Sequence, residues 1–368
     1  MNLKTFNQVF TIMLLFGGLF ITSCDENEEP DIDFNQLTTK ALSDFVNVVA
    51  NPLYADFESL SLQLKSDVEA LTANPTAANL EKARNSWKSI RVVWEQSEGF
   101  LIGPVDENNY DPYLDTWPTD YNAMDNLMAS TTPITLNYLA GLDDPDSEAE
   151  LTLRGFHPLE YLLWGLSGNK LYSEITARQK EYMVALAGDI NNNVSKLKAS
   201  WLPGPTYYGN EIVNAGKSGS IYDSKKDALE EIANALIGIC VEVGEGKMLD
   251  PFSPSPDSTI TESPYAHNSF TDFKNNIIGA RNVYTCTYKS TTGKSLSDIV
   301  KANNAALDLE IKSKFDLAIN SFNGFTTSFE QAIYKDRPKV QNTIDALTSL
   351  QETIDIKLIA YLQQYVKD

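Results

Sequence analysis

The sequence predicts an all-α protein of two helical-bundle domains that pack side by side, with a functional site near their interface. Apolar residues recur at helical spacing through most of the chain, and the alternation typical of strands is scarce. The length of 368 residues is sufficient for two ordinary domains. A Pro/Gly-rich stretch that begins at Pro203 separates two groups of about four helical patterns each.

The composition is that of a folded and strongly acidic protein. Hydrophobic residues make up 42% of the chain and aromatic residues 10%, which excludes a wholly disordered chain. The net charge is −21, from 29 Lys and Arg against 50 Asp and Glu. Such a chain is a poor ligand for nucleic acid, whose phosphates require basic partners, and its surface attracts cations.

Residues 1–23 are expected to form a lipoprotein signal peptide. Lys4 precedes an apolar segment, residues 9–20, that is too short to span a membrane stably. The segment continues into Ile21-Thr22-Ser23-Cys24, which resembles a bacterial lipobox, in which cleavage leaves Cys24 as the lipidated first residue. Several acyl chains together hold a protein on a membrane. The alternative is an ordinary secretory signal in which Cys24 occurs by chance.

An acidic tether, residues 24–33, is expected to follow the signal peptide. Its run of Asp and Glu resembles the surface-export signals of some Gram-negative lipoproteins, although a solvated spacer has the same composition. We therefore expect a lipid-anchored outer-membrane protein in the cell envelope of a Gram-negative-type bacterium, facing the surface.

The first bundle is expected over residues 34–202. Its first helix is kinked or ended by Asn51-Pro52, and a new helix, capped at Thr76, carries Trp87 and Trp94 on one face as core residues. The helix is expected to end at residues 99–104, and residues 105–120 are expected to form a long polar loop, which is unusual inside a compact domain and so suggests a function. A long helix then occupies most of residues 173–201.

The segment Gly155-Phe156-His157-Pro158-Leu159-Glu160 is the first candidate site. With Pro158 as the first helical residue, His157 is predicted at the N-cap and Glu160 one turn along on the same side. An imidazole and a carboxylate at the positive end of a helix can bind a metal or an anionic ligand. The alternative is local, with Glu160 completing a capping box and His157 only capping the helix.

The second bundle is expected over residues 203–368. It contains the other histidine, His267, in a loop rich in hydroxyls and carboxylates that leads into a helix with Asp272 and Asn275. Because each half places one histidine in a polar cluster beside a helix start, a cleft between the two domains is the expected location of the site. Further helices are predicted over residues 224–247, 296–322 and 339–366.

Several common motifs are absent from the sequence. Gly216-Lys217-Ser218 and Gly293-Lys294-Ser295 lack the first glycine of a phosphate-binding loop, and neither HExxH nor GxSxG occurs. Cys240 lies in an apolar helical run and is expected to be a buried thiol. A disulfide between Cys240 and Cys286 is permitted outside the cytoplasm but is not indicated by their spacing.

The ordered set of motifs resembles the imelysin family, also called M75 peptidase-like or iron-regulated-protein-A-like. Residues 155–163 match its GxHxxE motif, and the resemblance covers most of the mature chain. The other matching positions are Trp87, Arg91, Trp94, Glu95, Glu98, Gly103-Pro104, Asp115-Thr116-Trp117-Pro118, Glu262 to Ser269, Asp272, Asn275 and Gly279.

The resemblance implies two bundle-like domains with the GxHxxE site near their interface, in an envelope protein associated with iron uptake. We expect iron, or a ligand that carries it, to bind in an interdomain cleft, with zinc as a second possible metal. His157 and Glu160 supply only two ligands, so the expected partners are Glu98, Asp115 and His267. The residues expected to bind the ligand or shape the site are Trp94, Trp117, Glu262, Ser269, Asp272 and Asn275.

Two other functions remain open from the sequence. The family label implies a metal-dependent peptidase, yet the residues provide neither a full set of zinc ligands nor a positioned general base. A surface module that binds peptide or polysaccharide would use the aromatic loops instead. The expected partners are a metal ion or iron complex, the membrane through Cys24, and a protein of an uptake system.

Overall fold

The computed structural model describes residues 33–144, 147–201 and 207–367. Residues 34–368 form one compact unit. The predicted signal peptide, the predicted lipidation site at Cys24 and the predicted domain boundary at residues 202 and 203 lie outside the described residues. The division of the helices into domains 34–202 and 203–368 therefore stays a prediction.

The described residues confirm the predicted all-α class. In the first part of the chain the helices are α1 (Phe34–Asp44), α2 (Asn51–Ala73), α3 (Ala77–Ser97), α4 (Pro104–Glu107), α5 (Tyr110–Asp115), α6 (Tyr121–Ala129), α7 (Leu136–Ala140), α8 (Glu148–Leu151), α9 (Phe156–Trp164), α10 (Ala177–Trp201) and α11 (Tyr208–Val213).

The second part is also helical apart from one small hairpin. Its elements are α12 (Lys225–Val241), α13 (Asp250–Phe252), α14 (Ser269–Thr285), α15 (Leu296–Asn303), α16 (Ala305–Ser321), α17 (Phe329–Lys335), α18 (Arg337–Thr353), α19 (Ile359–Tyr365) and the antiparallel strands β1 (Thr287–Tyr288) and β2 (Thr291–Thr292). Wide π-turns occupy Phe45–Ala50, Glu242–Leu249 and Ile354–Leu358, and short 3-10 turns occupy Glu98–Phe100, Tyr172–Glu174, Ser258–Ile260 and Phe322–Gly324.

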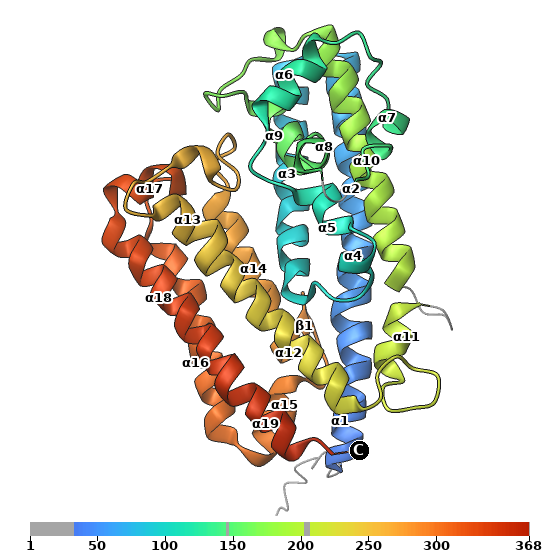
Figure 1. The fold of residues 1–368 in the computed structure, drawn as a ribbon, viewed down its shortest axis with the longest axis vertical. Helices are drawn as coiled ribbons and strands as arrows, with labels where there is room; N and C mark the ends of the chain where they lie inside the picture. The colour runs from blue at the N-terminus through green and yellow to red at the C-terminus, as the bar shows by residue number, and fades with distance from the viewer. Residues whose placement is uncertain (1–32, 145–146, 202–206, 368) are drawn as a thin grey trace, which may run out of the picture. The chain divides into compact units, whose positions relative to one another are not determined.

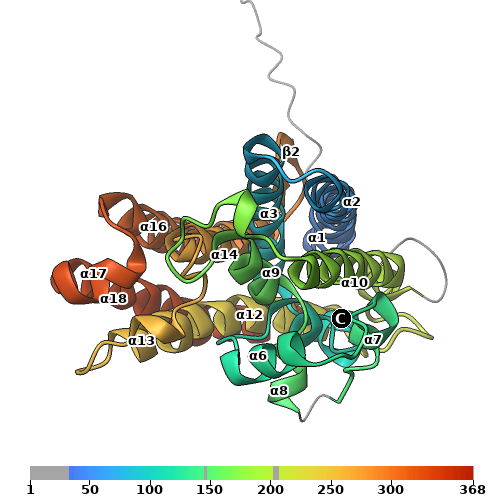
Figure 2. The same cartoon turned by 90° about the horizontal axis from the view of Figure 1, so that it is seen from above.

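Two groups of long helices make up the bundle. Helices α2, α3 and α10 pack together, and α12, α14, α16 and α18 form a second group, drawn in yellow to red in Figure 1 and seen from above in Figure 2. The main contact between the groups joins α3 to α14. Polar caps begin several of these helices; for example, the Thr76 side chain accepts a hydrogen bond from Asn79 N and begins α3 as predicted.

Two sequence predictions in the first half need correction. Of the two predicted outcomes, a kink or an end at Asn51-Pro52, the structure rules out the end. A π-turn carries the chain directly into α2, with Pro52 in the first turn of α2, where a missing N–H costs little. Residues 105–120 are not a loop without regular structure, since they contain most of α4 and all of α5. Both helices are shorter than two turns, with four residues in α4 and six in α5. So short a helix shows no apolar periodicity in the sequence.

Helix α3, together with the 3-10 turn Glu98–Phe100 that follows it, approaches α14 through two glycines. A Cβ added to Gly99 would lie 2.6 Å from Ala280 N, and one added to Gly279 would lie 2.2 Å from Gln96 O. Real side chains do not tolerate such distances, so only glycine permits the backbones to come this close. This contact brings the last turns of α3 against the middle of α14, where Asn276 lies.

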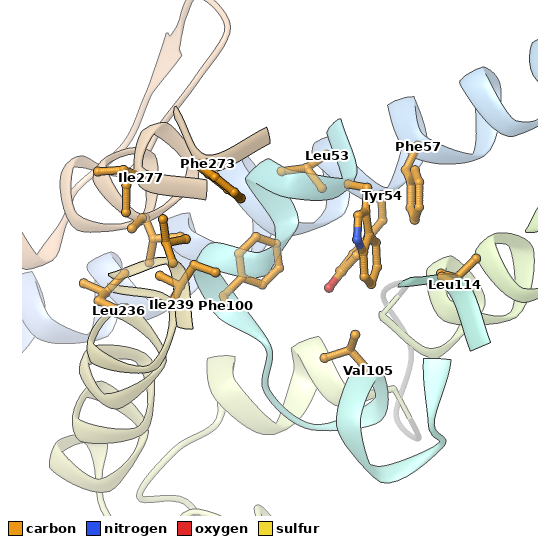
Figure 3. Close-up of a cluster of buried hydrophobic side chains, with 14 of the residues drawn as sticks. Leu53, Tyr54, Phe57, Phe100, Val105, Leu114, Leu236, Ile239, Phe273 and Ile277 are labelled. Carbon is orange, nitrogen blue, oxygen red and sulfur yellow. The ribbon is translucent and has the colours of Figure 1, made fainter. Parts of the chain in front are cut away.

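The hydrophobic core continues across the same contact. Figure 3 shows Phe100 between Tyr54 of α2 on one side and Ile239 of α12 and Phe273 of α14 on the other, and these four side chains are buried. The rings of Phe100 and Tyr54 meet edge to face with centroids 5.5 Å apart. The two helix groups therefore share one core near the site.

The described residues also answer two smaller questions. Cys240 and Cys286 are free buried thiols, so they form no disulfide, and the prediction of a buried Cys240 is confirmed. Among the described helices, none has the length and the apolar composition that crossing a membrane requires.

Candidate functional site

A group of charged side chains is buried where α3, α5 and α9 meet the π-turn Glu242–Leu249, α14 and the loop before it. None of the nine is more than 4% exposed. We call this group the buried charge cluster. Its members are Arg91, Glu95, Glu98, Asp115, His157, Glu160, Lys247, Glu262 and Asp272.

Arg91 is the central cation of the cluster. It forms ion pairs with Glu95, one turn along α3, and with Asp115 at the end of α5. Its Nη2 lies 2.8 Å from Glu262 Oε1, and its Nε lies 3.6 Å from Asp272 Oδ1. A guanidinium suits this position because its planar set of donors can serve several carboxylates at once.

Lys247 is the second buried cation. Its Nζ lies 3.0 Å from Glu98 Oε2, 3.2 Å from Glu242 Oε1, 3.6 Å from Glu262 Oε1 and 3.8 Å from Glu95 Oε2. Burial would lower the pKa of the ammonium, but these carboxylates outweigh burial and raise it well above its usual value. Lys247 is therefore a permanent charge, and no other residue of its π-turn is both charged and buried.

His157 lies inside the first turn of α9 and not at its N-cap, which corrects the sequence prediction. Gly155 is the N-cap, with φ of 78°, and a Cβ there would lie 2.1 Å from Leu114 O. The tight approach of this glycine to the end of α5 begins the helix two residues earlier than Pro158 alone suggested. Pro158 is tolerated because N–H groups in a first turn have no acceptor within the helix.

His157 faces three carboxylates of the cluster. Its Nε2 lies 3.1 Å from Asp115 Oδ1 and 3.8 Å from Glu262 Oε1, and its Nδ1 lies 3.7 Å from Glu160 Oε2. Burial would lower the pKa of the imidazole, but Asp115 and Glu160 outweigh burial and raise it to about 10. The ring is therefore an imidazolium at neutral pH, held between acids.

Glu160 does not complete a capping box. Its Oε1 accepts hydrogen bonds from Tyr265 N at 3.0 Å and Ala266 N at 2.7 Å, in the loop before α14. The predicted GxHxxE motif thus fixes the loop from the second half of the chain against α9. This loop also carries Glu262 into the cluster.

Two sets of side chains in the described structure converge closely enough to hold a metal ion. Asp115, His157 and Glu262 each offer a ligand atom, and these atoms lie within 4.8 Å of one another; Glu95, Glu98 and Asp115 form a second such set. Glu262 Oε2 and both nitrogens of His157 are buried without an aligned hydrogen bond to any described residue. Buried polar atoms are rarely left without a partner. The first set holds three such atoms and the second holds one, Glu95 Oε1, so the first set is the better candidate.

The cluster holds more negative than positive groups. Its six carboxylates face only Arg91, Lys247 and the imidazolium of His157, an excess of three negative charges when all are ionised. Burial together with the neighbouring Glu95 raises the pKa of Glu98 well above its usual value, and burial raises that of Asp272. Protons or a bound cation must therefore neutralise part of this charge.

Most of the predicted site residues come together here. Trp94 Nε1 donates to Asp115 Oδ2 at 2.7 Å, and the ring of Trp117 lies 5.1 Å from Lys247 Nζ. Asp272 accepts hydrogen bonds from Asn268 Nδ2 at 2.7 Å and from Ser263 Oγ at 2.6 Å. Aromatic and hydroxyl groups thus orient the carboxylates around the two cations.

Three predicted residues lie outside the cluster. His267 Nδ1 lies 3.1 Å from Glu330 Oε2 with a half-exposed ring, and Ser269 Oγ donates to the same carboxylate at 2.8 Å. Neither His267 nor Glu160 belongs to the converging ligand sets. Asn275 accepts a hydrogen bond from Gln96 and so joins α14 to α3 outside the site.

Sequence reasoning missed Asn276, one residue further along α14 and so turned by about 100°. Asn276 Nδ2 donates to Glu95 Oε2 at 2.6 Å and to Glu98 Oε2 at 2.5 Å. Arg91 and Lys247 were also missed as site residues. Each lies at helical spacing within a stripe of apolar residues. A charged residue in such a stripe is the sequence signal by which both could have been found.

The fold and the site together define an all-helical protein whose two groups of helices enclose a buried cluster of carboxylates, one histidine and two cations. The sequence model of the peptidase M75 family, described as Imelysin, matches residues 50–355. The chain belongs to the imelysin family, which confirms the resemblance seen in its motifs.

Known relatives agree with this assignment. Iron-regulated protein A of Synechococcus elongatus is 26% identical over 333 residues, covering 89% of this chain and 87% of that protein. The solved structure of a candidate iron-regulated protein A precursor from Parabacteroides distasonis has a TM-score of 0.80 and 26% identity, over 90% of this chain and 96% of the other. An imelysin-like protein from Psychrobacter arcticum shares the fold, with a TM-score of 0.71 and 16% identity over 90% and 97% of the two chains.

Proposed function

We propose that this protein binds iron within the buried charge cluster, with Asp115, His157 and Glu262 as ligands, and that it serves iron uptake. The observation that supports this most is the convergence of these three side chains inside a cluster with an excess of buried negative charge. A cation at this point would neutralise the excess and give partners to Glu262 Oε2 and to one nitrogen of His157.

The donor atoms favour iron over thiolate-seeking metals. Carboxylate oxygen and imidazole nitrogen suit iron, and zinc remains a second candidate because it accepts the same donors. Two relatives bear the name iron-regulated protein A, which supports a role connected with iron. The donor set therefore fits the metal that the family names suggest.

The three cationic groups have defined roles in this proposal. Arg91 contacts both Asp115 and Glu262, so it holds these carboxylates in place and limits their joint charge. Lys247 does the same for Glu98 and Glu95. His157 must lose its proton to bind a metal through nitrogen, so metal binding releases a proton and strengthens as pH rises.

Burial argues for an ion over a polymer as the ligand. His157 is 2% exposed and Glu262 1% exposed, so an extended peptide or a polysaccharide has no access to them in this conformation. A peptidase would in addition require a positioned general base and an open coordination position on the metal. A small bound cation requires only the converging buried ligand atoms, and neither a general base nor access for a polymer.

We also propose that the protein acts at the outer membrane, to which it is attached through Cys24. Cleavage before Cys24 and lipidation of this residue would attach the protein to the outer membrane, with residues 25–33 as a tether. Iron bound there would be passed to a partner protein of an uptake system. The acidic surface suits this role because it attracts cations.

The test is an anaerobic Fe²⁺ titration of the purified protein and two single variants. His157→Ala removes a proposed ligand, and His267→Ala removes the only other histidine, which pairs with Glu330 outside the cluster. We expect tight binding of Fe²⁺ in the wild type and His267→Ala and its loss in His157→Ala, with circular dichroism confirming that both variants fold. Equal Fe²⁺ affinity in all three proteins would refute the assigned site.

A further inference from the structure

A groove of about 530 Å³ lies where α7 packs on α10 (Figure 1), with α2 as its other wall. On α10 the groove is lined by Lys180, Glu181, Val184, Ala185 and Gly188, whose spacing places them on one face of the helix. None of these three helices contributes a residue to the buried charge cluster. The groove is therefore separate from the proposed iron site.

The floor of the groove is apolar. Ile134 and Ala185 are buried in it, whereas Leu136 of α7 and Val184 of α10 are 39% and 38% exposed. Gly188 keeps the groove open because it has no side chain, and even a Cβ at its position would lie 3.7 Å from Leu136 Cδ1. Apolar surface exposed in a concavity of this size is typical of a small-molecule site, where an apolar group that displaces water lowers the free energy.

The charges available around the groove are positive. Of its three charged lining residues, Glu181 is already paired, because its Oε2 accepts a hydrogen bond from Arg178 Nη1 at 2.8 Å. The Lys180 ammonium has no hydrogen bond or ion pair with any described residue. The Lys65 ammonium lies 4.0 Å from Glu69 Oε1, and this pair is weak because its side chains are 40% and 52% exposed. Two available ammonium groups in one groove are unusual in a chain of net charge −21.

We propose that the groove binds one molecule of a carboxylic acid with an unbranched alkyl chain. The alkyl chain covers Leu136 and Val184, and the carboxylate pairs with Lys65 and Lys180. The chain would bury the exposed apolar floor, and the anionic head would supply the counter-charge that the two ammonium groups lack. Lysine stems suit this arrangement because they lie along apolar surface while their charged ends stay in water.

The size and the charge of the groove favour a single small molecule over larger partners. A stable protein interface buries at least about 1,000 Å², whereas a volume of about 530 Å³ is that of a site for one small molecule. The surface of an anionic bilayer is repelled by the net charge of −21. The inference concerns a free carboxylic acid and does not depend on the proposed iron site.

Isothermal titration calorimetry with decanoate below its micelle concentration tests the inference, and decanol serves as the neutral ligand of the same chain length. The charge variant, Lys65→Gln/Lys180→Gln, removes both ammonium groups and retains most of each stem. The matched control, Lys82→Gln/Lys196→Gln, removes two exposed lysines that do not line the groove. Circular dichroism checks that each variant folds.

The wild type and the control are expected to bind one decanoate and to bind decanol about tenfold more weakly, because two partly exposed ion pairs together contribute about this factor. The charge variant is expected to bind decanoate about tenfold more weakly than the control and to bind decanol as the control does. No saturable binding of decanoate by the wild type, or equal decanoate affinity in the charge variant and the control, would overturn the inference.

Two substitutions of the exposed Val184 locate the ligand. Val184→Glu places an acid on the floor of the groove and is expected to weaken decanoate binding about tenfold, whereas Val184→Lys places a third cation there and is expected to retain it. Equal decanoate affinity in these two variants would place the ligand elsewhere and reject the groove. Co-sedimentation with phosphatidylglycerol vesicles is measured in parallel. Vesicle binding that the charge variant loses, without saturable binding of free decanoate, would overturn the inference in favour of a membrane surface.

Discussion

Replacing Lys247 by methionine tests how the buried charges balance. The substitution keeps the length of the side chain and removes an ammonium that lies 3.0–3.8 Å from four carboxylates. Removing one partner of a buried ion pair costs about 3–5 kcal/mol, because the other partner stays buried without compensation. With an entropy of unfolding of roughly 2.1 cal/mol/K per residue over residues 34–368, a loss of about 4 kcal/mol lowers the Tm by roughly 6 °C.

Thermal unfolding followed by circular dichroism measures this change. Lys82→Met on the exposed face of α3 is the control and is expected to alter the free energy of unfolding by less than about 0.5 kcal/mol. Added Mn²⁺ should raise the Tm of Lys247→Met more than that of the wild type, because a cation then occupies the vacated position. A free energy of unfolding for Lys247→Met that equals the wild-type value would refute this view of the cluster.

Three further predictions follow from single residues. Gly279→Ala should destabilise the protein by at least about 2 kcal/mol in urea unfolding, because its Cβ would lie 2.2 Å from Gln96 O, whereas Gly238→Ala, with no atom within 4 Å, should be neutral or stabilising. Burial and nearby carboxylates raise the pKa of Asp111 to about 8. The protonated carboxyl therefore favours the folded state at low pH, and this contribution is lost as pH rises from about 4 through 8. Asp111→Asn should gain stability relative to the wild type over that range, and parallel pH profiles of the free energy of unfolding would contradict this. Cys24→Ala should abolish labelling by radioactive palmitate in cells and release the protein from the membrane fraction, whereas continued labelling would reject lipidation at Cys24.

Helical periodicity was sufficient to predict the fold class and most long helices, because an amphipathic helix repeats the same signal over several turns. Short elements carry no such repeat. For this reason the sequence did not predict α4, α5 or the hairpin of β1 and β2. The predicted start of α9 was wrong because the true start is set by the close contact of Gly155 with Leu114, which is far away in sequence.

The site was partly predictable from residue types alone. A histidine and a glutamate in one motif pointed to His157 and Glu160, and the motif family added Asp115 and Glu262. Their convergence depends on the close approach of α3 and α14 and on the loop that Glu160 binds, neither of which leaves a local pattern in the sequence.

The buried cations were overlooked because Lys and Arg are usually exposed. Arg91 shares a stripe with Trp87 and Trp94, and Lys247 continues the apolar stripe of Leu236 and Val243. A charged residue on an apolar helix face predicts a buried ion pair, because its burial requires partners of opposite charge.

Diffraction at the iron absorption edge is the most direct measurement of the central claim. Crystals of the protein would be soaked in Fe²⁺ without oxygen, and the anomalous difference density would be examined. We expect one strong peak in bonding contact with Asp115, His157 and Glu262. Density without a peak among these three side chains, in crystals that contain iron elsewhere on the protein, would contradict the proposed site.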